Sequence, residues 1–276
     1  MRWRAVISAL DDYEAFRSRV SVYLHPLAGQ PVLWHVVSAL LEVSPPPEEI
    51  RVLHRAGAPV DIPDAPSTMV LDAVPPGEET VALRSAVTRP GLTLLVDGAA
   101  PLILSGTILR LLRAGEHGVA MVSESSDRVA GVAVSGEGPA LASAEDPRFP
   151  IGASRVVPAS ELELLRVSDR HSLADVSTAL RDRLVRRHEA AGVTFLLPAT
   201  VWLDADVRIG PDTIIYPGVV LEGATEIGSE CVIGPYSRVV ESLIGKGAEL
   251  TGWNYVVRTA VRNQAVLEPY VRRGLD

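Results

Sequence analysis

Aliphatic side chains recur every six residues through the C-terminal third of the chain, and this spacing limits the fold more than any other feature. The register contains Leu203, Ile209, Ile215, Leu221, Ile227, Ile233 and Val239, then, after five-residue steps, Ile244, Leu250 and Val256, and lastly Val261 and Leu267. A hexad suits a short strand that points one aliphatic side chain inward before a corner, and three hexads make one coil. A β-sandwich is the alternative, but its strands alternate with a period of two. The pattern therefore predicts a parallel β-helix, in which each coil stacks on the next.

Two further sets of residues follow from this register. Four positions after each aliphatic residue the side chains are mostly small or β-branched, and Cys231 is one of them, so we expect it to be buried. Tyr236, Trp253 and Tyr270 each come three positions after an inward aliphatic residue, at a corner where a large ring cannot fit inside the coil. We expect these rings on the surface, where they suit a contact with another subunit or a protein partner.

Composition and charge exclude several classes of function. The chain has 276 residues, 47% of them hydrophobic, and a net charge of −8 without a cluster of Lys and Arg, which argues against a nucleic-acid surface. Its one cysteine cannot form an internal disulfide, which fits a reducing cytoplasm. The N-terminus does not resemble a secretory signal, and the longest uncharged run, 20–41, is interrupted by Pro and Gly. We expect a cytoplasmic protein without a membrane span.

The N-terminal part alternates short apolar runs with helical patterns, which predicts an α/β layered sheet. Such sheets bind ligands at the carboxyl ends of their strands. A helix that Asp169 can cap and Gly192 can end then links this part to the hexads. We predict an α/β domain over 1–166, a linking helix over 167–192 and the β-helix over 193–276.

Three stretches resemble the bifunctional N-acetylglucosamine-1-phosphate uridyltransferase and glucosamine-1-phosphate acetyltransferase family. They are His25–Pro31, Ala191–Thr194 with Pro198 and Ala199, and Asp204–Gly210 running on to Leu221–Gly223. The resemblance implies a Rossmann-like nucleotidyltransferase domain, a linking helix and a left-handed β-helix that joins three copies into a homotrimer. The acetyltransferase site of the family lies farther along the β-helix than this chain extends, so the resemblance implies no such activity here.

The chain departs from the family at the positions that hold the nucleotide and the metal. Carboxylates stand in the loop that cradles the triphosphate, Ala15 replaces its Arg and Val22 its Lys, and the only lysine of the chain is Lys246. The glycines of the uridine-reading segment are replaced around Glu79. Ala99 stands at the position of the Asp that binds Mg²⁺, and Ser168 at that of the Asn that is the second ligand.

These departures favour a degenerate nucleotidyltransferase that acts as a non-catalytic scaffold, regulatory or binding subunit. We expect no catalytic residue and no cofactor, and a vestigial nucleotide pocket at Asp11, Arg17 and Glu79. The alternative is an active sugar-1-phosphate nucleotidyltransferase that makes a UDP-sugar with these residues and Mg²⁺. Asp97 would then hold the metal, since a shift of two residues keeps the side chain on the same face of its strand.

Overall fold

The computed structural model describes residues 1–11, 14–58, 60–115, 120–122, 131–135 and 155–274, and the chain divides into two compact units. The first unit contains residues 1–25 and 31–176, and the second contains Pro26–Gln30 and Ser177–Asp276. The division places a five-residue N-terminal segment with the β-helix and splits the linking helix between the units. Within the described residues, no helix is both long and apolar enough to span a membrane.

The first unit is built on a seven-stranded sheet in the order β5-β4-β1-β6-β8-β7-β9. Its strands are β1 (Trp3–Ala9), β4 (Ile50–Arg55), β5 (Met69–Val74), β6 (Leu92–Asp97), β7 (Ala120–Val122), β8 (Gly131–Ser135) and β9 (Arg155–Val157). The four strands β5, β4, β1 and β6 run parallel, whereas β8 pairs antiparallel to β6. Every residue of β6 is buried, as expected for a central strand covered on both faces. The predicted α/β layered sheet is confirmed.

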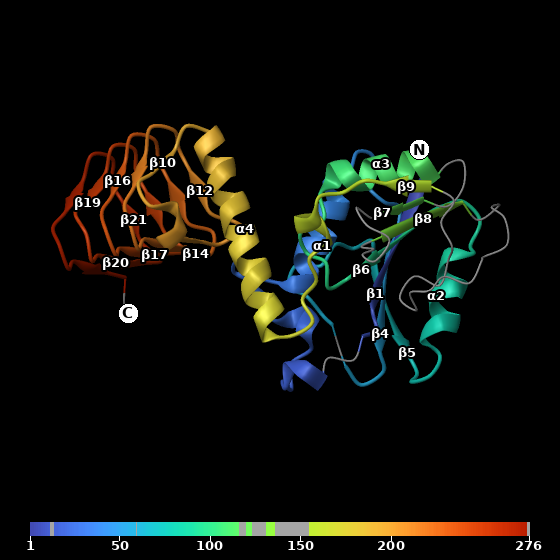
Figure 1. Ribbon diagram of the computed structural model, residues 1–276. Helices are drawn as coiled ribbons and strands as arrows, with labels where there is room; N and C mark the ends of the chain where they lie inside the picture. Colours follow the sequence, from blue (N-terminus) through green and yellow to red (C-terminus); the bar gives the residue numbers. More distant parts are fainter. Residues whose placement is uncertain (12–13, 59, 116–119, 123–130, 136–154, 275–276) are drawn as a thin grey trace. The chain divides into compact units, whose positions relative to one another are not determined.

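Short helices complete the first unit (Figure 1). They are the α-helices α1 (Val32–Leu41), α2 (Glu79–Val87) and α3 (Ser105–Gly115), and the 3₁₀ helices η1 (Glu14–Phe16), η2 (Val22–Leu24) and η3 (Glu161–Leu164). In α1 an apolar stripe packs into the core, where Val36 and Leu40 are fully buried. The helix ends at Leu41, four residues before the proline run that begins at Pro45.

The helix α4 (Arg170–Ala190) begins and ends at the signals found in the sequence. Oδ1 of Asp169 accepts the backbone N–H of Ser172 at 2.7 Å, and this hydrogen bond holds the pKa of Asp169 below its ordinary value. At the other end Gly192 has a φ of 92°, and the N–H of Val193 donates to the carbonyl of His188 at 3.0 Å. This hydrogen bond gives the carbonyl of His188, in the last turn of the helix, a partner from the residue after Gly192.

The second unit is a left-handed parallel β-helix with three flat faces (Figure 1). One face contains β10 (Thr194–Phe195), β13 (Ile214–Ile215), β16 (Val232–Ile233), β19 (Glu249–Leu250) and β22 (Val266–Leu267). The next contains β11 (Trp202–Leu203), β14 (Val220–Glu222), β17 (Arg238–Val240), β20 (Tyr255–Val257) and β23 (Arg272–Arg273). The third contains β12 (Arg208–Ile209), β15 (Glu226–Ile227), β18 (Leu243–Ile244) and β21 (Ala260–Val261), and the 3₁₀ turn η4 (Pro198–Thr200) precedes β11.

The hexad aliphatics stack in register inside these coils. Leu203 lies opposite Leu221, which lies opposite Val239 and then Val256, and all four are buried. Every other member of the register is also buried, so the predicted inward set is confirmed in full. Cys231 is completely buried as predicted, and its burial raises the pKa of the thiol.

The strands β2 (Pro26–Leu27) and β3 (Gln30–Pro31) form a small hairpin, of which the segment Pro26–Gln30 belongs to the second unit. Within the second unit it lies against the first coil of the β-helix. The N–H of Ala205 donates to the carbonyl of Ala28 at 2.9 Å, and Nε2 of Gln30 donates to Oδ2 of Asp206 at 2.5 Å. Two of the stretches that resemble the uridyltransferase family are therefore in direct contact.

Candidate functional site

The carboxyl ends of β1 and β6 lie side by side at the centre of the sheet, and an aspartate lies at or just beyond each of them. Ser8 and Asp97 are partners in the parallel register, and the N–H of Gly98 donates to the carbonyl of Ser8 at 2.9 Å. Asp97 is only 2% exposed and Asp11 is half-buried. The sheet thus brings together two of the residues predicted to form the site.

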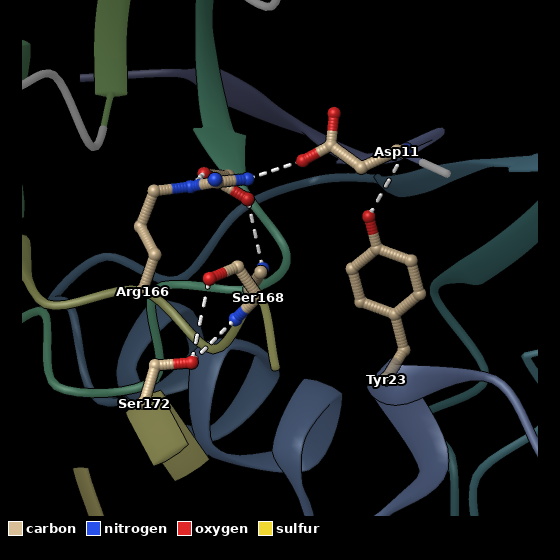
Figure 2. A network of polar contacts seen from close by, with 7 residues as sticks. Asp11, Tyr23, Arg166, Ser168 and Ser172 are labelled. Atoms are coloured by element: carbon tan, nitrogen blue, oxygen red, sulfur yellow. Dashed lines mark hydrogen bonds and ion pairs between the residues drawn. The ribbon is translucent and has the colours of Figure 1, made fainter. Parts of the chain in front are cut away.

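A guanidinium joins these two carboxylates. Arg166 donates from Nε to Oδ2 of Asp97 and from Nη2 to Oδ2 of Asp11. Figure 2 shows the arginine side chain extended toward Asp11. The backbone fixes this approach, because the N–H of Val167 donates to the carbonyl of Ala99 at 2.8 Å. The segment that carries Arg166 is therefore anchored to the turn that follows Asp97.

Neighbouring groups hold the aspartates and the arginine segment in place (Figure 2). The N–H of Ala99 donates to Oδ1 of Asp97 at 2.8 Å, and the N–H of Asp11 donates to the buried hydroxyl of Tyr23 at 3.4 Å. Ser168 donates its N–H to Oγ of Ser172 at 2.9 Å. The polar atoms around the guanidinium are thus largely engaged with one another.

The residues present do not fit the Mg²⁺ that the family resemblance implies. Both carboxylate oxygens of Asp97 accept N–H donors, one from Ala99 and one from Arg166. Ser168, at the position of the family's second ligand, offers a hydroxyl that lies 3.4 Å from the hydroxyl of Ser172. Mg²⁺ is bound in proteins through one or two carboxylates and needs near-ideal octahedral geometry. Among the described residues, no group of three His, Cys, Asp or Glu side chains could hold a metal.

The other two predicted pocket residues lie apart from this cluster. Glu79, in the first turn of α2, pairs with Arg55 at the end of β4 at 3.8 Å. Arg17 is exposed after η1 with a φ of 48°, and its N–H donates to the carbonyl of Glu14 at 3.1 Å. Asp12, another of the carboxylates at the position of the family's triphosphate loop, lies outside the described residues.

Arg166 was not among the residues predicted from the sequence. It is separated from Asp97 by 69 residues and from Asp11 by 155 residues, so no local motif connects the three. One feature of the sequence could have pointed to it: Arg166 is a lone cation in the apolar run Leu164–Val167, in a part of the chain that contains no lysine. A buried anion such as Asp97 favours a cation beside it, and arginine is the permanently charged residue available in this part of the chain.

Comparison with known proteins places the sequence likeness in the β-helix. Residues 206–240 match the bacterial transferase hexapeptide family (six repeats). The bifunctional protein GlmU of Alkaliphilus metalliredigens is 37% identical over 108 residues, which are 39% of this chain and 24% of that protein. The bifunctional protein GlmU of a Geobacillus species is 46% identical over 88 residues, which are 32% of this chain and 19% of that protein. The chain resembles the bifunctional GlmU proteins.

This likeness confirms the resemblance predicted from the sequence, but it covers a limited part of the relatives. The chain spans about a quarter of the length of the curated GlmU proteins it matches. Among solved structures it is similar to the nucleotidyl transferase Mth528 of Methanothermobacter, with 19% identity, a TM-score of 0.49, and coverage of 67% of this chain and 99% of that one. The 2-C-methyl-D-erythritol 4-phosphate cytidylyltransferase of Thermus thermophilus has 16% identity and a TM-score of 0.47 over 67% of this chain and 100% of that one.

Proposed function

We propose that this protein is a non-catalytic relative of the sugar nucleotidyltransferases and works as a scaffold or binding subunit. The observation that carries the proposal is the guanidinium of Arg166, which lies between Asp97 and Asp11. Its charge compensates the buried Asp97 without any metal, and its Nε and Nη2 donors are engaged by the two carboxylates. A metal would have to displace an arginine whose segment is anchored by the hydrogen bond from the N–H of Val167 to the carbonyl of Ala99.

The charges around the strand ends support the same proposal. Asp11, Asp97 and Arg166 together leave one negative charge. Where the family places a lysine, Val22 is buried in the core. Phosphoryl transfer depends on positive groups that neutralise the charge developing on the transferred phosphate. Here the guanidinium of Arg166 already pairs with two carboxylates, so the cluster offers a triphosphate no net positive charge.

Calorimetric titration of the full chain with UTP in the presence of Mg²⁺ tests the proposal. We expect no saturable heat at UTP concentrations up to about 1 mM, which corresponds to a binding free energy weaker than about 4 kcal/mol. An intact GlmU titrated in parallel serves as the positive control. Micromolar binding of the nucleotide that requires Mg²⁺ and is lost in Asp97→Asn would favour the active-enzyme alternative instead.

The proposed assembly is a homotrimer through the β-helix. Tyr236, Trp253 and Tyr270 are 60%, 49% and 70% exposed, as predicted for corner positions. They stack in successive coils with ring centroids 5.5 and 5.7 Å apart, so they form one continuous apolar ridge. Aromatic residues are enriched in subunit interfaces, and an exposed ridge of this kind is costly unless another surface covers it.

Light scattering at micromolar concentration is expected to return three times the 29.5 kDa mass of the chain. Trp253→Ser, which removes the central ring of the ridge, should shift the mass toward that of the monomer, because a buried aromatic anchor typically contributes about 2 kcal/mol or more to an interface. Val81→Ser, at an exposed apolar residue of the first unit, serves as the matched control and should leave the mass unchanged. A monomeric native chain would refute the trimer.

A further inference from the structure

The strand β5 forms one edge of the seven-stranded sheet, and within the described residues no other strand pairs with its outer side. Its pairing with β4 shows which backbone groups lie on that side. The N–H of Ala56, directly after β4, donates to the carbonyl of Val74 at 2.9 Å, so Val74 turns its polar groups toward β4. Successive residues of a strand turn these groups to opposite sides. Leu71 and Ala73 therefore offer N–H donors and carbonyl acceptors to a further strand.

The strand has few of the features by which proteins protect an open sheet edge. Its sequence, Met69–Val74, contains no proline, lysine or glycine, and Val70 and Leu71 are 41% and 37% exposed. Its one charged residue, Asp72, pairs with Arg51 of β4, so this charge is partly neutralised within the sheet. An apolar edge of this kind is a template for another chain in an extended conformation.

A groove of about 440 Å³ lies between this edge of the sheet and α2. Leu53 and Val74 line the groove from the sheet, and Val81 and Ala82 line it from the helix. Val81 is 68% exposed. Because every second side chain of a strand lies on the same face, a strand added to β5 would direct alternate side chains toward α2. An aliphatic side chain at such a position would cover Val81 and remove apolar surface from water.

Charged groups mark the two ends of this groove. Arg89 donates from Nη1 to Oε1 of Glu49 at 2.9 Å, and Glu49 directly precedes Ile50, the partner of Met69 at the start of β5. Arg89 is half-exposed, and its Nε and Nη2 have no hydrogen-bond partner among the described residues, so they can bind a carboxylate. Glu78 is exposed beyond the end of β5, and its carboxylate has no partner in the described part of the chain. The groove therefore has an end that can bind an anion and an acidic end.

We propose that β5 binds an extended segment of another protein, which joins the sheet as an additional strand. The segment runs antiparallel to β5, the slightly more stable pairing, and places an aliphatic side chain in the groove. A basic residue of the segment lies at Glu78, and an acidic residue four positions later lies at Arg89. This spacing follows because β5 is about 16 Å long, which four or five residues of a strand span, and side chains on one face are an even number of positions apart.

A second copy of the chain fits this edge poorly, because β5 contains no basic residue to match Glu78. The edge also takes no part in the cluster of Asp11, Asp97 and Arg166. The inference therefore does not depend on the function proposed above.

Fluorescence anisotropy of the labelled peptide Thr-Lys-Thr-Val-Thr-Glu-Thr, titrated with the full chain, tests the proposal. We expect saturable binding with a Kd below about 1 mM. A peptide in which Lys and Glu are exchanged should bind the native protein more weakly, and Glu78→Gln should reduce this difference. Ala73→Pro removes an outward N–H without removing a donor to β4, and it should raise the Kd at least about tenfold. Ala73→Thr keeps that N–H and is the matched control, with a Kd within about twofold of the native value.

Hydrogen exchange of the native chain, followed by NMR, gives a second readout that needs no variant. Bound peptide should slow the exchange of the amides of Leu71 and Ala73. The proposal is wrong if no saturable binding is found up to about 5 mM, if Ala73→Pro and Ala73→Thr bind the peptide equally well, or if the two amides exchange at the same rate with and without it. Protection of these amides without peptide, lost on dilution of the protein, would mean that a second copy occupies the edge, which would also overturn the proposal.

Discussion

With UTP, Mg²⁺ and N-acetylglucosamine 1-phosphate, this protein is expected to release pyrophosphate at least about 10²- to 10³-fold more slowly than an intact GlmU assayed beside it. Loss of a single preorganised charge contact typically slows an enzyme by that amount. Here Ala15 and Val22 stand where the family has an arginine and a lysine, and Arg166 occupies both carboxylates at the strand ends. Such losses are not additive, so the expected factor is a lower bound.

A rate within about tenfold of the control, a barrier difference of only about 1.4 kcal/mol, would contradict the non-catalytic proposal. Glucose 1-phosphate in place of the amino sugar tests whether the acceptor alone is responsible for a low rate. If turnover is found, Asp97→Ala identifies its origin: loss of that turnover would mean that Asp97 leaves Arg166 and holds the metal. This outcome would establish the active nucleotidyltransferase instead.

The β-helix could be predicted residue by residue because its repeat admits one arrangement. Each hexad fixes which side chain points inward, and stacking at a constant spacing between strands carries the register from Leu203 to Leu267. The exposed corner positions of Tyr236, Trp253 and Tyr270 followed from the same register. Their stacking follows as well, because the three are spaced at 17 residues and paired strands of successive coils differ by the same number.

The site at the strand ends was only partly predictable. Asp11 and Asp97 lie at the ends of apolar strands, and parallel strands of one layer end at the same edge, so their proximity could be expected. The partner of these acids comes from a distant segment whose path depends on one backbone hydrogen bond, from Val167 to Ala99. The hairpin Pro26–Gln30 is a similar case, since its contact with Asp206 joins residues 176 apart in the sequence. Contacts between distant segments that do not belong to a repeat produce no periodic pattern in the sequence, so they could not be predicted from it.

Replacement of Arg166 by Met is expected to destabilise the first unit by about 3 to 5 kcal/mol, the usual effect of removing one partner of a buried ion pair. Asp97 is 2% exposed, and without the guanidinium its carboxylate keeps the N–H of Ala99 as a donor but loses its cation in a poorly hydrated site. Differential scanning calorimetry should detect a fall in Tm of about 10 °C, since a domain of this size loses about 2 to 4 °C per kcal/mol. Arg208→Met, which breaks the exposed pair with Glu226, is the matched control and should change stability by less than about 1 kcal/mol.

A second variant separates the loss of charge pairing from a simple loss of packing. Asp97→Asn combined with Arg166→Met removes the charge of both partners, while the asparagine keeps an oxygen that can accept the N–H of Ala99. We expect the double variant to recover more than half of the stability lost in Arg166→Met, because replacing a whole buried pair by neutral groups is often nearly neutral. If the double variant is as unstable as the single one, the arginine stabilises the unit through its aliphatic stem rather than its charge. If Arg166→Met costs less than about 1 kcal/mol, the guanidinium is not what compensates Asp97, and the proposed replacement of a metal by an arginine loses its basis.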